Sequence, residues 1–133
     1  MILTYEDYLP TPGSLTLEEM QSLHRKIKED AGHDEDALGL YKGLLAAAVK
    51  YSESRACWPL WDWGQKLAED SGRTSRHDRV IDCFNILARY LRNQGKQASW
   101  RDVLGDEKEN PYCRKRIGDF ACYLVFIESL NAR

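Results

Sequence analysis

Hydrophobic residues recur every three or four positions along most of the chain, which predicts a series of amphipathic helices. The first run begins after Thr16, which forms a capping box with Glu19, and it ends at Gly32. The second run begins at an aspartate cap, Asp34 or Asp36, and its stripe is broad enough to pack on more than one side. The apolar positions of the two runs are Leu17, Met20, Leu23 and Ile27, then Leu38, Tyr41, Leu44, Leu45, Ala48 and Val49.

The middle of the chain predicts two further helices that are separated at a glycine. Residues 57–60 contain a proline, which suits the first position of a helix, and we expect that helix to end before Gly72. Thr74 or Ser75 then caps the next helix, which ends near Gly95. The apolar positions of this second helix are Val80, Ile81, Phe84, Leu87, Ala88 and Leu91.

The C-terminal third predicts one short helix and one long helix. Ser99 caps the short helix, which ends at Gly105, and Pro111 begins the long one. The residue types over 122–127 are also typical of a strand. Their continuity with a charged helical start favours a helix, with Ile117, Phe120, Ala121, Leu124 and Ile127 on one face.

These elements together predict an all-α fold. The chain has 133 residues, enough for one domain with a real core, and 43% hydrophobic with 30% charged residues is normal for a globular protein. Alternating strand patterns are almost absent. We therefore expect a compact bundle of five or six helices over residues 15–133, preceded by an irregular arm over residues 1–14.

The cysteine spacing and the N-terminus bear on the compartment. The four cysteines lie far apart with no Cys-x-x-Cys pair, which argues against a zinc ribbon or a redox motif. We expect reduced thiols, mostly buried, at Cys57, Cys83, Cys113 and Cys122. The start of the chain has no basic region typical of a signal peptide, and no apolar run approaches the ~20 residues that span a bilayer. The expected object is a cytoplasmic, bacterial-type protein without membrane association.

The charges are unevenly distributed along the chain. Residues 1–72 carry 7 basic and 13 acidic side chains, whereas residues 73–133 carry 12 basic and 8 acidic ones. Such asymmetry is typical of a basic face for an anionic partner. It is equally typical of two halves that attract each other across one core, and both interpretations stay open.

The segment 73–79 is the first candidate site. A helix start exposes unpaired backbone N–H groups and carries partial positive charge. Arg73, Arg76 and Arg79 add three guanidinium groups there, so the segment is expected to hold a phosphate or carboxylate.

Three tryptophans just before this segment are the second candidate. Trp58 and Trp61 are three residues apart and are expected to share a helix face, whereas Trp63 points elsewhere. They either anchor the core or form a binding surface, since tryptophan is enriched at binding hot spots. An exposed Trp63 close to Arg73 or Arg76 would give a pocket with an aromatic wall and a cationic floor.

A nucleic-acid interface is an alternative over residues 86–120. The segments 87–96, 99–105 and 114–117 supply a support helix, a short capped helix and a basic third helix, and together they resemble a helix-turn-helix. The resemblance implies that the third helix enters the major groove. The contacting residues would be Arg101, Arg114, Lys115 and Arg116. The acidic linker 106–109 and a pI near 5.9 count against this alternative.

A third interpretation concerns histidines and aspartates. The residues in question are His33, His77, Asp78 and Asp119, and their order resembles the metal-binding pattern of HD-domain phosphohydrolases. That resemblance implies a divalent metal that activates a bound water. We favour a simpler role for Asp78, in the first turn of a helix capped by Ser75.

The other common catalytic motifs are missing from the sequence. The expected function is therefore a small interaction or regulatory protein that binds another protein or an anionic ligand, without cofactor or catalysis.

Overall fold

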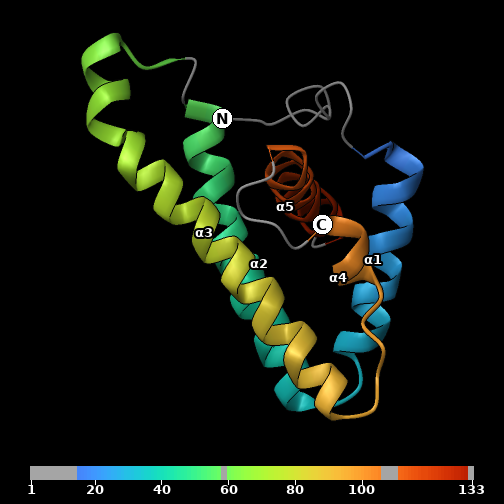
Figure 1. Ribbon diagram of the computed structural model, residues 1–133. Helices are drawn as coiled ribbons and strands as arrows, with labels where there is room; N and C mark the ends of the chain where they lie inside the picture. Colours follow the sequence, from blue (N-terminus) through green and yellow to red (C-terminus); the bar gives the residue numbers. More distant parts are fainter. Residues whose placement is uncertain (1–14, 58–59, 106–110, 132–133) are drawn as a thin grey trace.

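The computed structural model describes residues 15–57, 60–105 and 111–131, apart from the side chains at 70, 73, 111–115 and 131. Over these residues it contains five α-helices and confirms the all-α prediction (Figure 1). The helices are α1 (Leu17–Ala31), α2 (Glu35–Cys57), α3 (Trp63–Asn93), α4 (Trp100–Leu104) and α5 (Pro111–Asn131). The predicted arm over residues 1–14 lies outside the described residues.

The helices pack around α5. The most extensive helix contacts join α2 to α3 and α2 to α5, while α1 and α4 cover another side of α5. Residues 117–124 of α5 are all buried, so this stretch has neighbours in every direction. Gly118 permits the close approach, because a Cβ atom there would lie 2.6 Å from Tyr51 Oη of α2. The first turns of α3 extend away from α1, α4 and α5 (Figure 1).

Most predicted helix boundaries are confirmed, and they follow local rules. Glu19 N donates to Thr16 Oγ1 at 3.2 Å, and Thr16 N donates to Glu19 Oε1 at 3.0 Å, which completes the capping box of α1. Asp34 Oδ1 accepts from the backbone N–H of Ala37 at 2.7 Å and starts α2. The predicted bounds of α4 and the predicted start of α5 are confirmed, and residues 122–127 are helical. Ser99 precedes α4 but makes no side-chain capping hydrogen bond.

The predicted division of the middle of the chain is wrong. The helix α2 continues to Cys57, and α3 begins at Trp63 and runs through Gly72 without a break, so neither Thr74 nor Ser75 is a cap. The start of α3 is set by a capping box between Asp62 and Gln65 instead. A glycine inside a helix costs only about 1 kcal/mol relative to alanine. The extensive packing of α3 on α2 outweighs that cost. Trp58 and Pro59 lie outside the described residues.

The described cysteines are free as expected, but only one of the three is buried, whereas the sequence predicted that most would be. Cys57, Cys83 and Cys122 are free; Cys122 is buried and the other two are half-buried. The side chain of Cys113 lies outside the described part. No helix within the described ranges combines the length and apolar character that membrane crossing requires.

Glu128 joins α5 to α1 and α2, and its carboxylate should make the free energy of unfolding depend on pH. Its Oε1 accepts from Tyr41 Oη and lies 2.9 Å from His24 Nε2. Burial raises the pKa of Glu128, but the hydrogen bonds from His24 and Tyr41 and the nearby Lys28 charge outweigh it, so the pKa is lowered overall. A carboxyl with a depressed folded pKa stabilises the fold above its unfolded pKa of about 4.3, and that contribution is lost as the pH falls through the folded value.

We therefore expect the free energy of unfolding to fall as the pH drops below about 4.3, and Glu128→Gln to remove about 1 kcal/mol of this dependence. Urea unfolding between pH 3 and pH 7 measures both effects. Glu53→Gln, at an exposed position of α2, is the matched control and should keep the wild-type profile. An identical pH profile for Glu128→Gln and wild type would contradict this account.

Candidate functional site

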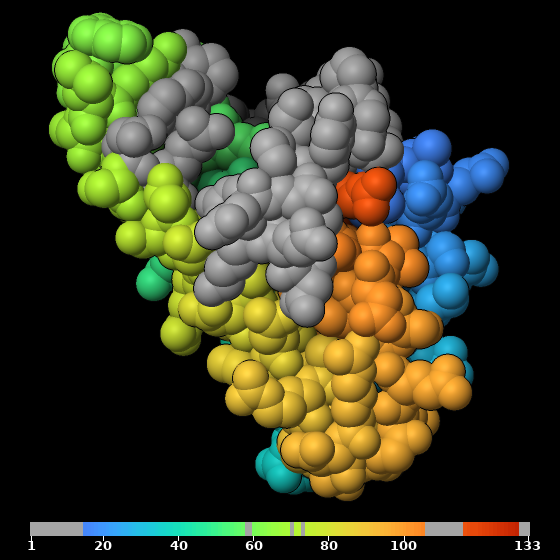
Figure 2. Space-filling model, viewed as in Figure 1, coloured from blue at the N-terminus to red at the C-terminus, as the bar shows by residue number. Residues whose placement is uncertain are grey.

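The start of α3, together with Leu60 just before it, carries an exposed apolar surface, here called the α3 tip and formed by Leu60, Trp63 and Leu67. These side chains are 71%, 74% and 63% exposed, while the remaining exposed large hydrophobic residues that the structure describes reach at most 46%. Trp63 and Leu67 are four residues apart and therefore share one helix face. The light green atoms of this end form a corner of the molecule (Figure 2). Scattered exposed apolar residues are ordinary, but a gathered set marks a binding surface.

The anion site predicted at 73–79 required a helix start at that point, and there is none. These residues lie within α3, where backbone N–H groups are engaged in helical hydrogen bonds rather than exposed at a start. Arg76 donates to Ser54 Oγ at 2.8 Å and lies 3.6 Å from a carboxylate oxygen of Glu69, so it joins α3 to α2. Arg79 is exposed, and the side chain of Arg73 lies outside the described part.

Among the described side chains, Trp63 and Arg76 do not form the predicted pocket with an aromatic wall and a cationic floor. Trp61 is half-buried and precedes α3, whereas Trp58 lies outside the described residues. Trp63 occupies the first position of α3, and Arg76 follows thirteen residues later. At 1.5 Å per residue their backbones are separated by about 20 Å along the helix axis. Trp63 is therefore exposed, as the binding-surface interpretation required, but Arg76 does not lie beside it.

The four residues of the metal hypothesis are not brought together. His33 lies in the turn between α1 and α2 beside Asp34, whose Oδ2 accepts from Tyr90 near the end of α3. His77 precedes Tyr90 by thirteen residues, which places it about 20 Å away along α3. Across the described ranges, no group of three or more His, Cys, Asp or Glu side chains could hold a metal ion.

Two residues of that hypothesis belong to a buried polar cluster between α2, α3 and α5. Arg55 Nη2 donates to Asp119 Oδ1 at 2.5 Å, and Arg55 Nη1 lies 3.8 Å from Cys122 Sγ. The ring of His77 meets Tyr51 edge-on, with ring centroids 5.2 Å apart. Burial raises the pKa of Cys122 to about 11, so its thiol is protonated at neutral pH and is no nucleophile. This cluster holds helices together.

No family model, curated protein or solved structure matches this chain. Any functional assignment therefore depends on the geometry of its own residues.

The structure departs from the helix-turn-helix interpretation at two points. Arg101 is only 3% exposed, and it donates to Asn85 Oδ1 and to the carbonyl oxygen of Gly105 rather than facing a phosphate. The helix α5 is enclosed over residues 117–124, so that part cannot lie in a DNA groove. Arg116 lies beside the carbonyl oxygen of Val103. The side chains of Arg114 and Lys115 lie outside the described part.

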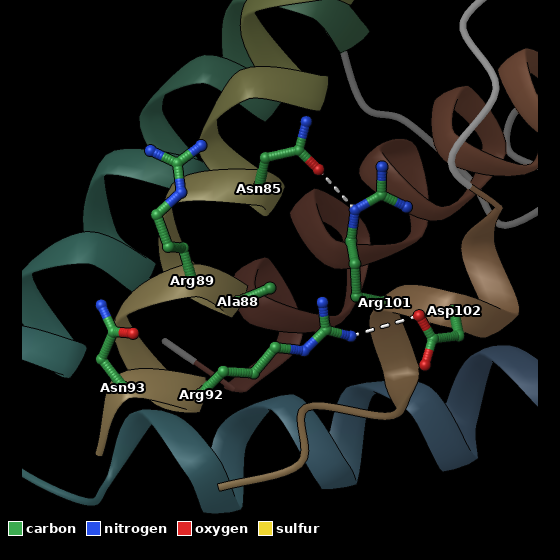
Figure 3. Close-up of a pocket in the computed structure, with 7 residues that line it drawn as sticks. All are labelled: Asn85, Ala88, Arg89, Arg92, Asn93, Arg101 and Asp102. Atoms are coloured by element: carbon green, nitrogen blue, oxygen red, sulfur yellow. Dashed lines mark hydrogen bonds and ion pairs between the residues drawn. The ribbon is translucent and has the colours of Figure 1, made fainter. Parts of the chain in front are cut away.

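A polar cleft between α3 and α4 is the second feature of the surface, and we call it the α3–α4 cleft. It has a volume of about 480 Å³ (Figure 3). Its lining residues are Asn85, Ala88, Arg89, Arg92, Asn93, Arg101 and Asp102. Sequence reasoning did not single out Arg89 and Arg92, although their spacing of four and seven residues from Asn85 places all three on one helix face.

Proposed function

We propose that this protein is an interaction module that docks the α3 tip into an apolar groove of a partner protein. The observation that carries the proposal is the gathering of the three most exposed large hydrophobic side chains of the described residues at one projecting helix end. Tryptophan supplies a large apolar area with few rotatable bonds and is enriched among residues that dominate binding energy. A helix that presents anchors four residues apart is the usual ligand of such a groove.

The local structure supports this mode of binding. The capping box of Asp62 and Gln65 fixes the start of α3, with bonds of 2.8 and 3.0 Å. Gly64 and Ala68 follow Trp63 and Leu67 directly, and their small size lets a partner approach the helix closely. Because the helix is already ordered, binding loses little conformational entropy.

The α3 tip alone is too small to form a whole stable interface. A patch of this kind covers a few hundred Å². A stable interface buries about 800 Å² on each partner. The partner is therefore expected to surround the apolar anchors with polar contacts to the flanking turns of α3.

We also propose that the module acts in the cytoplasm. The support is the free state of the three cysteines named above, since a reducing compartment maintains thiols in that form. Half-buried Cys57 and Cys83 would be open to oxidation elsewhere.

Trp63→Ala tests the proposal. We expect it to weaken binding to a partner by at least about 2 kcal/mol, roughly thirtyfold, because a central tryptophan anchor is lost. The melting temperature should not change, since Trp63 is 74% exposed. Partners are to be captured from cell extract with wild type and variant side by side, then purified and titrated by calorimetry.

The matched control for this experiment is Leu130→Ala, which removes a 46% exposed apolar side chain at the end of α5. Its affinity for the purified partner should equal that of wild type. If the Trp63→Ala variant bound every captured partner as tightly as wild type, the α3 tip would not be the docking surface.

A further inference from the structure

We propose that the α3–α4 cleft binds a small phosphorylated molecule, at a site separate from the α3 tip. Three arginine side chains line the cleft, and Asp102 is the one carboxylate among the described residues that line it. Figure 3 shows the guanidinium groups of Arg92 and Arg101 toward α4, and that of Arg89 on the other side of Asn85. Guanidinium groups present paired N–H donors that match the oxygens of a phosphate.

Among the arginines of the cleft, Arg89 has the most N–H donors that no described residue uses. It is exposed on α3, and within the described residues it makes no hydrogen bond or ion pair. None of its five N–H donors is therefore used by another described residue. A bidentate contact to phosphate is the strongest use of such a group.

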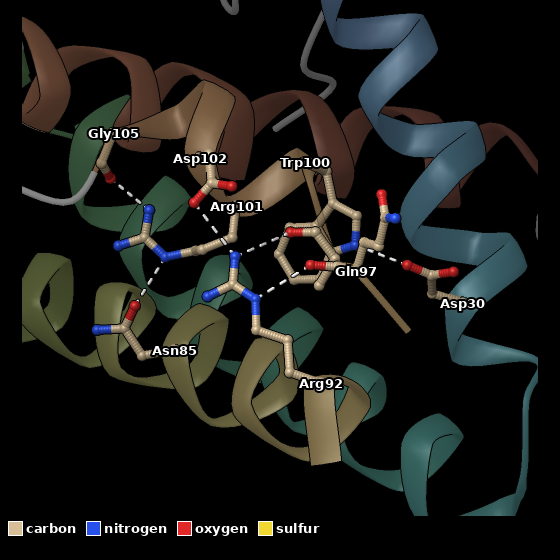
Figure 4. Close-up of polar contacts among 9 residues, drawn as sticks. Asp30, Asn85, Arg92, Gln97, Trp100, Arg101, Asp102 and Gly105 are labelled. Atoms are coloured by element: carbon tan, nitrogen blue, oxygen red, sulfur yellow. Dashed lines mark hydrogen bonds and ion pairs between the residues drawn. The ribbon is translucent and has the colours of Figure 1, made fainter. Parts of the chain in front are cut away.

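Arg92 is held in place beforehand. Its Nε donates to the carbonyl oxygen of Gln97 at 3.1 Å, and its Nη2 donates to Ala98 O and Asp102 Oδ1 (Figure 4). These bonds leave Nη1 directed into the cleft (Figure 3). A cation that is already oriented loses little entropy when it binds an anion.

Arg101 and Asn85 form the inner wall of the cleft. The buried Arg101 guanidinium donates through Nε to Asn85 Oδ1 at 2.7 Å. A positive charge in a buried position acts more strongly across a cleft than an exposed one, because the surroundings screen it less. Asp102 opposes this field only weakly, since its side chain is 77% exposed and paired with Arg92.

The dimensions favour a small ligand over a nucleic acid. A volume of about 480 Å³ is within the range of about 300–1,000 Å³ that is typical of small-molecule sites. The site is concave, and α5 presents no free face over residues 117–124 that could enter a groove of DNA. The chemical class is therefore a molecule with one or two phosphoryl groups.

Calorimetric titration of the full chain with inorganic pyrophosphate tests this assignment. Wild type should bind one pyrophosphate saturably, and Arg89→Ala should weaken the affinity about tenfold, as expected for loss of a charge-assisted contact. Arg79→Ala is the matched control: it removes the same charge from an exposed position of the same helix, outside the cleft. It should change the affinity no more than about twofold.

Several outcomes would overturn the assignment. These are the absence of saturable binding to wild type, an equal loss in the Arg89 and Arg79 variants, and tighter binding per phosphate to a DNA duplex than to pyrophosphate. Arg89→Ala removes no contact among the described residues, so its melting temperature should match wild type and its loss of binding reports the site alone. Trp63→Ala should bind pyrophosphate normally, which keeps this test independent of partner docking.

Discussion

Replacing Asp119 with alanine is expected to lower the free energy of unfolding by about 3 to 5 kcal/mol. Asp119 is only 1% exposed, and its partner Arg55, 26% exposed, is then left as a largely buried cation beside Cys122. Removing one member of a buried ion pair costs much more than the pair contributes, because the remaining charge stays desolvated. Urea unfolding followed by circular dichroism measures the loss.

Two further variants test whether the loss comes from the uncompensated Arg55 charge or from a fold that any substitution destabilises. Asp102→Ala breaks an exposed Arg–Asp pair, with a 3.2 Å separation, and should cost less than about 1 kcal/mol. The double replacement of Arg55 by Met and Asp119 by Leu removes both charges and should recover much of the loss. If the double variant were as unstable as Asp119→Ala alone, the uncompensated charge would not be the cause.

The helix boundaries that were predicted from sequence are those that neighbouring residues determine. A threonine and a glutamate three residues apart satisfy each other's backbone groups wherever they occur, and Pro111 suits a helix start for equally local reasons. The break expected at Gly72 is absent because the packing of α3 on α2 outweighs the small cost of a glycine inside the helix that starts at Asp62 and Gln65. A glycine followed by threonine and serine is weak evidence for a helix boundary when the helix packs against a neighbouring helix.

The exposure of Trp63 could not be predicted from its spacing. Apolar residues four apart look the same on a buried face and on a projecting one, and only the tertiary arrangement shows that the first turns of α3 extend away from the central helix. Only the part of the α3–α4 cleft that lies on α3 could be predicted from the sequence. Helical spacing places Arg89 and Arg92 on one face, but Arg101 joins them through the packing of the next helix, α4, which spacing along α3 does not show.

Replacing Trp100 with alanine is expected to lower the free energy of unfolding by about 3 to 5 kcal/mol. The indole is 1% exposed, lies 6.2 Å from the Phe84 ring between centroids, and donates from Nε1 to Asp30 Oδ2 at 3.0 Å. The helix α4 has only five residues and cannot be stable alone, so this side chain docks it to α1 and α3. Urea unfolding measures the loss.

The matched control is Trp63→Ala, which deletes the same side chain from an exposed position and should change stability by less than about 0.5 kcal/mol. The two variants should also differ in the phosphate titration. Arg101 and Asp102 are carried by α4, so loosening that helix should weaken pyrophosphate binding, whereas Trp63→Ala should leave it unchanged. A loss of stability below about 1 kcal/mol for Trp100→Ala would show that α4 is held mainly by other contacts, such as those of Arg92.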